Sequence, residues 1–397
     1  MKKEVKVIIG ANYGDEGKGL ATSYFAEKAR KEDKKCLNIL FNGGCQRGHT
    51  VETEKGFRHI YQHFGCGSHF GADTYFDQNF MVHPAVFMDE YNRLVAENEK
   101  PPKCYISPNC RVITFYDMFI NQIREQQRGN NKHGSCGYGI WETRRRYDNG
   151  KYALRFGDLI KMSRVELFCY LCDISKKYLP RRLAYCGITD IPYPYKEYID
   201  NSEMVWNYIN DLDEMVKRVE VTSFDDIADK YDTIIFEGAQ GLALDEDNYA
   251  EIPHTTASNT NSDVPRLRVE HIDCDIEIVY VTRTYFTRHG AGKLPTECDK
   301  SEINPNIEDL TNNPNDYQGS IRYGKFDRDA FFDRVTSDGY VTPKMSKQPH
   351  SSVFITHLNY TNNEICGNTT IEELWGSFDK TYVADGKFTR NVKVLED

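Results

Sequence analysis

The chain has 397 residues, a formal net charge of −10 and 39% hydrophobic residues. These values predict a folded protein with a large core, and they argue against a general nucleic-acid surface, because such surfaces carry a basic field. Residues 1–9 lack the apolar core of a secretory signal, and no apolar run reaches the roughly 18 residues that span a bilayer. We therefore expect a cytoplasmic protein with no nucleic-acid or membrane partner, whose twelve cysteines are reduced.

The first predicted elements form a strand, a glycine loop and a helix. Residues 5–9 are a short β-branched run that ends at a glycine, which predicts a buried strand. After a glycine-rich turn, residues 20–30 are mostly good helix formers. This order directs backbone N–H groups and a helix N-terminus at an anion.

The rest of the chain continues to alternate between predicted strands and helices. Apolar runs predict strands at 37–41, 232–236, 276–281 and 352–356, and helices are predicted at 85–98, 159–177 and 202–219. The alternation predicts a mainly parallel sheet with helices on both faces and ligands at the carboxyl ends of its strands. A stretch rich in Asn, Pro and Asp at 304–316 predicts a surface loop. No linker interrupts the chain, so residues 1–397 are predicted to form one large α/β domain.

The glycine-rich loop is Gly10-Ala11-Asn12-Tyr13-Gly14-Asp15-Glu16-Gly17-Lys18-Gly19. It is not a Walker A motif, which requires a glycine where Asn12 stands and a Ser or Thr where Gly19 stands. Its glycines still allow the close backbone approach of a phosphate site, and Lys18 supplies a mobile cation. Asp15 would repel phosphate unless it binds magnesium or serves as a general base. The loop therefore predicts a nucleotide site, with a glycine-rich surface turn as the alternative.

The run Gly14-Asp15-Glu16-Gly17-Lys18-Gly19 resembles the signature of the adenylosuccinate synthetase family. Further segments resemble the family's blocks in the same order. They are Gly43-Gly44-Cys45-Gln46-Arg47-Gly48-His49-Thr50, Gly134-Ser135-Cys136-Gly137-Tyr138-Gly139-Ile140, Phe236-Glu237-Gly238-Ala239-Gln240-Gly241, Thr256-Ala257-Ser258-Asn259-Thr260 and Thr287-Arg288-His289-Gly290-Ala291-Gly292. The resemblance covers most of the chain and implies the family's P-loop-related α/β fold.

The resemblance also implies a reaction. The family joins IMP and aspartate at the expense of GTP, through a phosphoryl group placed on the purine 6-oxygen. By carry-over, Asp15 takes the proton of the purine N1 and binds Mg²⁺, the Gly48 carbonyl completes the metal site, and His49 acts on the phosphoryl group as an acid and electrostatic stabiliser. Phosphate or donor-nucleotide contacts are implied for Gly14, Glu16, Gly17, Lys18, Gly19, Thr50, Arg322 and Asn359. Substrate contacts are implied for Gln46, Ser135, Cys136, Arg146, Gln240, Thr256 and Arg288.

Two of these implied roles have structural alternatives. Gln240 could instead satisfy backbone groups of its own loop. The run Arg144-Arg145-Arg146 lies where the family has an arginine that reaches the neighbouring subunit's nucleotide, which implies a homodimer. Which of the three arginines matches stays open, and a solvated basic helix face is the alternative.

Three departures from the family pattern bear on the choice of substrates. The segment around Arg322 is shorter than the family's aspartate-binding loop and lacks its threonines and most of its arginines, and Tyr138 stands where the family has another arginine. Asn359 replaces the aspartate that reads guanine, and an amide cannot accept both hydrogen bonds of the guanine edge, which argues for ATP. Gln46-Arg47 replaces the Asn-Ala that precedes Gly-His-Thr.

These departures leave three hypotheses. The leading one is a ligase for an IMP-like nucleotide and aspartate, driven by GTP or ATP. The second is a 2-aminoadenylosuccinate synthetase-like enzyme that uses (d)GMP with ATP or dATP, or a ligase with another amine. Viral relatives of that branch carry an asparagine near the position of Asn359, but they typically replace the catalytic aspartate that Asp15 retains. The third is a nucleotide-binding relative that has lost catalysis.

Overall fold

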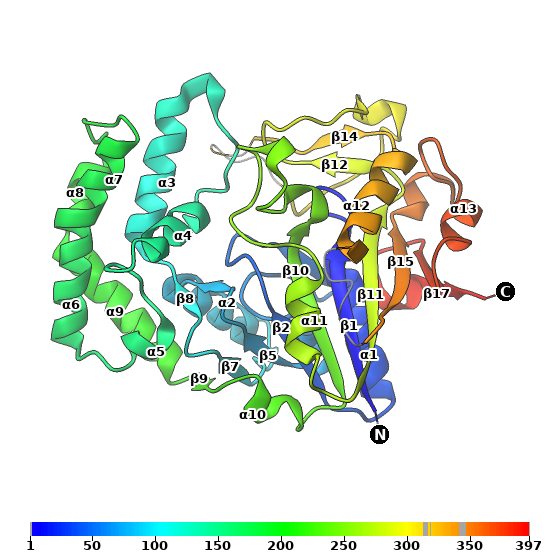
Figure 1. Cartoon of the computed structure of the whole chain (residues 1–397), viewed down its shortest axis with the longest axis horizontal. Coiled ribbons are helices and arrows are strands. Elements are labelled where there is room, and N and C mark those ends of the chain that lie inside the picture. Colours follow the sequence, from blue (N-terminus) through cyan, green and yellow to red (C-terminus); the bar gives the residue numbers. More distant parts are fainter. Residues whose placement is uncertain (1, 313–316, 318, 341–346, 397) are drawn as a thin grey trace.

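A ten-stranded sheet forms the centre of the computed structural model, which describes residues 2–312, 317, 319–340 and 347–396 (Figure 1). The strand order is β17-β16-β15-β11-β1-β10-β2-β5-β7-β9, and all neighbours are parallel except β16 and β17. The strands are β1 (Lys3–Gly10), β2 (Cys36–Leu40), β5 (Asp73–Phe76), β7 (Cys104–Ile106), β9 (Val219–Val221), β10 (Thr233–Gly241), β11 (Cys274–Arg283), β15 (His350–Thr356), β16 (Lys380–Ala384) and β17 (Val392–Leu395). The predicted, mainly parallel sheet is confirmed.

Helices cover both faces of this sheet because the strands are apolar on both sides. Val5, Val7 and Ile9 of β1 point into one core, whereas Ile8 points into a second core together with α1. This alternation is the period of two that a strand imposes on its side chains. The α-helices are α1 (Lys18–Lys31), α2 (Pro84–Ala96), α3 (Phe115–Arg128), α4 (Ile140–Asp148), α5 (Phe156–Leu159), α6 (Arg164–Asp173), α7 (Leu179–Tyr185), α8 (Tyr195–Ile199), α9 (Ser202–Val216), α10 (Asp225–Ala228), α11 (Asp263–Val269), α12 (Arg328–Tyr340) and α13 (Ile371–Trp375).

A group of helices stands beside the sheet, at the left of Figure 1, and contains α3, α4 and α6–α9. A third core of aromatic and aliphatic side chains joins this group to the edge of the sheet. Three small sheets lie outside the large one. They contain β12 (Phe286–Arg288), β14 (Arg322–Gly324) and β13 (Glu297–Cys298); β3 (His49–Glu52) and β4 (Arg58–Tyr61); and β6 (Met81–Val82) and β8 (Arg111–Val112). The β3–β4 hairpin carries His49, and β12–β14 carries Arg288 and Arg322.

The predicted strands are all present, but two predicted helices have different limits. The helix expected at 159–177 is broken, because Ser163 and Glu166 form a capping box that starts α6 after a gap. Helix α6 ends at Asp173 and is followed directly by a π-helical turn, Ile174–Tyr178. The helix expected at 202–219 ends at Val216, and Val219 begins β9.

Two further expectations concern segments outside the core. Residues 304–312 of the predicted loop contain no helix or strand, and residues 313–316 lie outside the described residues. None of the helices in the described part of the chain is long and apolar enough to cross a bilayer.

Candidate active site

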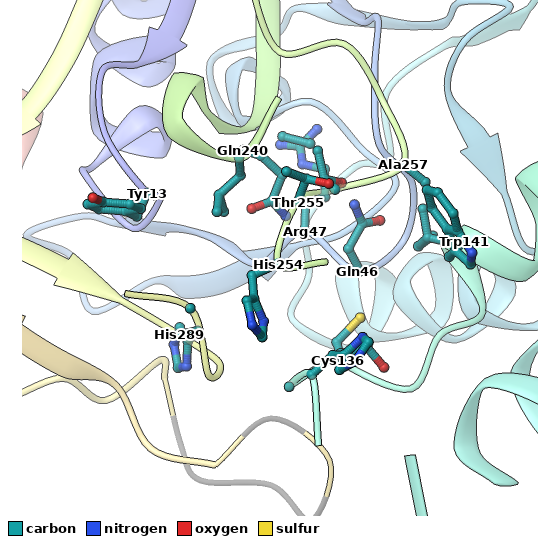
Figure 2. Close-up of a pocket in the computed structure, with 18 of the residues that line it drawn as sticks. Tyr13, Gln46, Arg47, Cys136, Trp141, Gln240, His254, Thr255, Ala257 and His289 are labelled. Carbon is teal, nitrogen blue, oxygen red and sulfur yellow. The ribbon is translucent and has the colours of Figure 1, made fainter. Parts of the chain in front are cut away.

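Loops at the carboxyl ends of the central strands enclose a cavity of about 540 Å³. Figure 2 shows Gln46, Cys136, Gln240, His254 and His289 around it. The cavity lining includes these residues expected from the sequence: Asp15, Gln46, Gly48, His49, Ser135, Cys136, Gln240 and Thr256. Residues far apart in the chain therefore converge at the edge of the sheet where a parallel α/β fold binds its ligands.

The phosphate loop between β1 and α1 is organised around Glu16. Its buried carboxylate accepts the N–H groups of Asn12 and Gly14, both at 2.9 Å. Lys18 Nζ lies 2.9 Å from the other oxygen of Glu16, and the Lys18 side chain is only 1% exposed. Lys18 is therefore held by a buried ion pair, so the expectation of a mobile cation is wrong for this conformation. The cavity lining does not include Gly14, Glu16, Gly17, Lys18 or Gly19.

Two glycines of this loop are required by its geometry. Gly17 has φ +99°, and a Cβ there would lie 2.9 Å from Thr356 Cγ2. A Cβ on Gly19 would lie 2.6 Å from the Thr50 carbonyl oxygen. These contacts let α1 begin directly after Gly17, against the ends of β3 and β15.

Asp15 reaches the cavity from a strained position in this loop. It has φ 59°, in the left-handed region. Its main-chain carbonyl accepts a hydrogen bond from Arg283 Nε, and its carboxylate lies 3.6 Å from His289 Nε2. His289 also lines the cavity. Sequence reasoning missed His289, although it lies in a recognised block directly after Arg288.

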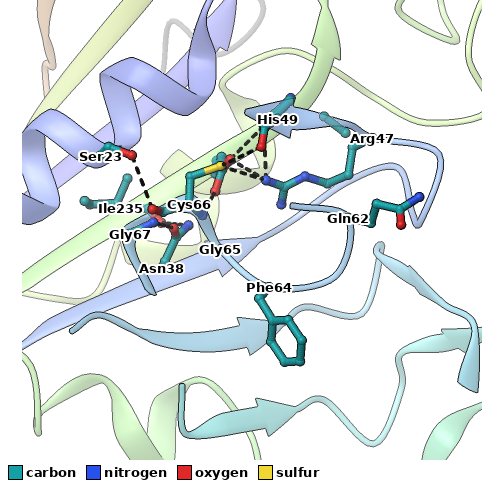
Figure 3. Close-up of polar contacts among 12 residues, drawn as sticks. Ser23, Asn38, Arg47, His49, Gln62, Phe64, Gly65, Cys66, Gly67 and Ile235 are labelled. Atoms are coloured by element: carbon teal, nitrogen blue, oxygen red, sulfur yellow. Dashed lines mark hydrogen bonds and ion pairs between the residues drawn. The ribbon is translucent and has the colours of Figure 1, made fainter. Parts of the chain in front are cut away.

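His49, which lines the cavity, is held by a buried ionic network (Figure 3). Its Nδ1 lies 2.7 Å from Glu237 Oε1, and Arg47 Nη2 contacts the same carboxylate oxygen. The Cys66 N–H donates to Glu237 Oε2 at 3.0 Å. Sequence reasoning assigned no role to Glu237, although it directly follows a predicted strand and so stands where site residues were expected.

This network shifts the proton affinities of its members. Burial lowers the pKa of His49 to about 4, and the neighbouring Arg47 cation acts in the same direction. Burial alone would raise the pKa of Glu237, but Arg47 and His49 outweigh it and hold the pKa at about 2. At neutral pH, Glu237 is therefore ionised and His49 is uncharged in the free protein.

Where the substrate nucleotide is expected, neutral polar side chains line the cavity beside the charged Arg124, Glu125 and Arg128. Ser135 Oγ accepts a hydrogen bond from Asn121 Nδ2 at 2.8 Å. Burial raises the pKa of the Cys136 thiol to about 11, so this side chain is a neutral contact at pH 7. Both polar atoms of the Gln46 amide are buried without a hydrogen-bond partner among the described residues. Unsatisfied groups of this kind in a cavity wall are typical of a binding site.

The cavity also fits the predicted magnesium site. Asp15 and Gly48 both line it, and they offer a carboxylate and a carbonyl oxygen. Magnesium prefers oxygen ligands and usually takes one or two from the protein and the rest from phosphate and water. The residues present therefore suit a magnesium–nucleotide complex.

The sequence profile of adenylosuccinate synthetase matches residues 7–340. The chain belongs to the adenylosuccinate synthetase family. An adenylosuccinate synthetase of Clostridium botulinum is 29% identical over 301 residues, covering 73% of this chain and 65% of that protein. The chain thus spans slightly less than two thirds of that relative. A second, from Limosilactobacillus fermentum, is 25% identical over 344 residues, covering 83% of this chain and 72% of the relative.

Solved structures confirm the adenylosuccinate synthetase fold. A fully ligated adenylosuccinate synthetase from Plasmodium falciparum matches with a TM-score of 0.72 at 17% identity, covering 99% of this chain and 100% of that one. A succinoaminodeoxyadenylate synthetase from cyanophage S-2L, bound to dGMP and dATP, matches with a TM-score of 0.63 at 16% identity, covering 100% and 97%. Both branches that the sequence resembles therefore share this architecture.

The structure corrects the place of Arg146 in this adenylosuccinate synthetase relative. Arg146 does not line the cavity; its side chain is 1% exposed and pairs with the fully buried Asp117, with Nε 2.9 Å from Oδ1. Its remaining donors bind the carbonyls of Tyr152 and Val112. Each nitrogen of the guanidinium thus donates to an acceptor within the protein. Arg145 is the exposed member of the run and lies over the Trp141 ring.

Four other predicted contacts, Thr50, Arg288, Arg322 and Asn359, are also absent from the cavity lining. Arg288 pairs with Glu251 at 2.7 Å and stacks over the Tyr13 ring, and Arg322 pairs with Glu297 at 2.6 Å. Both guanidiniums are engaged with acidic partners and neither lines the cavity. Thr50 Oγ1 contacts Thr311 Oγ1 at 2.6 Å. Asn359 is exposed in a short 3₁₀ turn, Leu358–Tyr360, directly after β15.

Proposed function

We propose that the chain is a ligase that joins an amino acid to the 6-position of a purine nucleotide through a 6-phosphoryl intermediate. The default substrates are aspartate and IMP, and the phosphoryl donor is GTP or ATP. The observation that carries the proposal is that Asp15, in the phosphate loop, and His49, in β3, line one cavity together with Gln240, Ser135 and Thr256.

The first step exploits the position of Asp15. Its carboxylate accepts the proton of the purine N1, which places negative charge on the 6-oxygen. That oxygen attacks the γ-phosphorus of the donor, a P–O bond to the donor breaks, and the nucleoside diphosphate leaves. Asp15 and Gly48 would hold Mg²⁺, which neutralises phosphate charge when bound. The strained φ of Asp15 and its anchored carbonyl keep the carboxylate directed at the cavity.

The second step uses the phosphate as a leaving group. The amino group of the amino acid attacks C6, the C6–O bond breaks, and inorganic phosphate departs with the electron pair. The amine loses a proton as the new C–N bond forms, the departing phosphate takes up that proton, and Asp15 releases the N1 proton to solvent. His49, which is uncharged in the free protein, would gain a proton more readily beside the phosphoryl dianion, because a nearby negative charge stabilises the imidazolium. It would then act as the acid and electrostatic partner of that group.

A second substrate set is favoured by Asn359 and by the shortened segment around Arg322. An asparagine reads guanine less well than a carboxylate does, which supports ATP as donor. The loss of arginines weakens the support for a dicarboxylic amino acid, because guanidinium groups are the natural bidentate partners of carboxylates. The phage enzyme of the same fold was solved with dGMP and dATP. A (d)GMP ligase, or one with another amine, is therefore the alternative.

A mass-spectrometric screen distinguishes these functions. The full chain is incubated with magnesium, ATP or GTP, each of IMP, dIMP, GMP and dGMP, and each amino acid. The proposal predicts a single dominant adduct together with stoichiometric phosphate. An adduct only from GMP or dGMP would select the alternative, and tight nucleotide binding without any adduct would show a relative that has lost catalysis.

Matched variants test the residue roles. Asp15→Ala and His49→Ala are expected to lose at least about 100-fold in kcat, at the low end of what acid–base groups contribute. The controls are Asp229→Ala and His271→Ala, whose side chains are 97% and 60% exposed. Full activity in both site variants would show that these residues do not perform the chemistry.

The remaining organisation is also proposed. We propose that the chain acts as one catalytic domain, that it is a homodimer and that it works in the cytoplasm. All twelve cysteines are free, which suits a reducing compartment. Light scattering of the purified chain measures its oligomeric state.

A further inference from the structure

Arg47 is a buried cation beside the candidate catalytic histidine, and it also lines the cavity (Figure 2). It lies in the segment between β2 and β3, two residues before His49, and its side chain is 0% exposed. One nitrogen, Nη2, contacts Glu237 Oε1 and lies 3.0 Å from His49 Nδ1 and 3.6 Å from Cys66 Sγ (Figure 3). The family pattern has an alanine at this position, so the resemblance assigns Arg47 no role.

The burial of Arg47 is not explained by stability. Its Nε and Nη1 are buried and have no hydrogen-bond partner among the described residues. An unsatisfied buried donor costs about 1–3 kcal/mol, and more when it belongs to a charged group. Removing Arg47 alone would strand the buried Glu237 charge, but replacing both partners of a buried ion pair by apolar groups is often neutral or stabilising, so folding as such does not require the pair. Such a costly group beside an active-site residue indicates a functional use.

The contacts of Arg47 also explain how three potential metal ligands lie together. The ligand atoms of His49, Cys66 and Glu237 lie within 4.8 Å of one another. Arg47 Nη2 is in contact with all three, so the guanidinium itself is the cation of this cluster. Glu237 is fixed on both oxygens, because Oε2 accepts the Cys66 N–H at 3.0 Å.

The fixed carboxylate determines which nitrogen of His49 carries the proton. The ionised Glu237 can only accept, so Nδ1 donates to Oε1 at 2.7 Å; Arg47 Nη2, 3.0 Å from Nδ1, then donates to Glu237 and not to the ring. Nδ1 is therefore the protonated nitrogen of the neutral ring, and Nε2 is the one left for a ligand in the cavity that His49 lines. Second partners of this kind commonly set the tautomer and the orientation of a functional histidine.

We propose that Arg47 is a positioning residue, which clamps Glu237 and thereby holds His49 as the Nδ1-protonated tautomer with Nε2 available to the substrate. Its catalytic consequence rests on the proposed ligase function. Its structural consequence does not, because the tautomer of His49 is a property of the free protein.

The kinetic test compares Arg47→Ala and Arg47→Lys with Arg30→Ala, a 57% exposed arginine in the last turn of α1, away from the site. Arg47→Ala is expected to lower kcat about 100-fold, with KM for the nucleotide changed less than about threefold, because positioning affects the acid–base step. Arg47→Lys should retain part of the activity, and millimolar guanidinium should restore at least about tenfold of the loss in Arg47→Ala. A merely structural arginine would not be rescued by a free guanidinium ion. Unchanged kcat in Arg47→Ala would overturn the proposal.

The spectroscopic test separates this proposal from the ligase assignment. The protein is labelled with ¹⁵N-histidine, and His49→Gln assigns the His49 signals. The wild type should show His49 protonated at Nδ1 near neutral pH, and Arg47→Ala should show a mixture of tautomers. If the wild type has no ligase activity but this change is seen, the proposed function fails while the positioning role stands. An unchanged tautomer in folded Arg47→Ala, or in Arg47→Lys if the alanine variant does not fold, refutes the positioning role.

Discussion

The role of Arg146 can be tested directly, because the family resemblance implies that it contacts the substrate, whereas the structure shows it in a buried ion pair with Asp117. As a substrate contact, its loss would weaken nucleotide binding; as half of a buried ion pair, its loss would destabilise the fold. In Arg146→Met, the buried Asp117 carboxylate keeps only the Thr114 hydroxyl at 2.9 Å and the Thr114 N–H at 2.8 Å. An uncompensated buried charge of this kind costs about 3–5 kcal/mol.

This cost converts into a measurable shift of the melting temperature. Unfolding entropy is about 2.1 cal/mol/K per residue, which for this chain amounts to about 0.8 kcal/mol/K and predicts a fall in Tm of about 4–6 °C. Differential scanning calorimetry measures the shift, and nucleotide KM is measured well below Tm. Arg145→Met on the same helix is the control and should change Tm by less than about 1 °C, because exposed substitutions change stability little. The double variant Asp117→Asn/Arg146→Met should recover part of the loss, since it removes the stranded charge and keeps the capping acceptor of α3. An unchanged Tm with a raised nucleotide KM in Arg146→Met would refute this account.

Three further predictions address the loop, the buried histidines and the donor base. Gly17→Ala should lower the affinity for a nucleoside triphosphate, measured by calorimetry, at least about tenfold more than the control Gly56→Ala does. Both glycines have positive φ, but only at Gly17 would an added Cβ clash with Thr356. Equal effects in the two variants would show that this contact does not matter for binding. Stability should fall as pH drops from about 6.5 to 4, because burial lowers the pKa of His49 and of His83 to about 4, so that the unfolded chain takes up protons that the native state does not. Urea midpoints across this range test it, and the slope should flatten in His83→Asn; a flat wild-type profile would contradict it. Asn359→Asp should shift the kcat/KM ratio toward GTP over ATP by about tenfold, the value of one hydrogen bond to a charged group; no shift relative to Asn362→Asp would exclude Asn359 from base reading.

Sequence alone determined the local order of this protein. Short-range signals predicted β1, the glycine loop and α1 at nearly their observed limits. These signals are the apolar run before Gly10, the glycines that follow it and the helix-forming residues after the loop. The alternation of such units implied a parallel sheet, and the motif blocks named the family. The predicted limits of a helix were wrong where a capping residue was not recognised: Ser163 is the N-cap of α6 and so begins a new helix.

Only the tertiary structure decided which side chains pair with one another. Glu16 occupies the donors that the phosphate loop would otherwise direct at an anion, and Arg146 is directed to Asp117 instead of a substrate. Glu237 lies 188 residues from His49 in the chain yet shares a hydrogen bond with it. Which charged side chains pair depends on which of them lie close together in the folded protein. Burial makes pairing more important, because leaving a buried charge unpaired costs free energy. A charged residue's type is therefore readable from sequence, whereas its partner, and so its role, depends on the folded sheet.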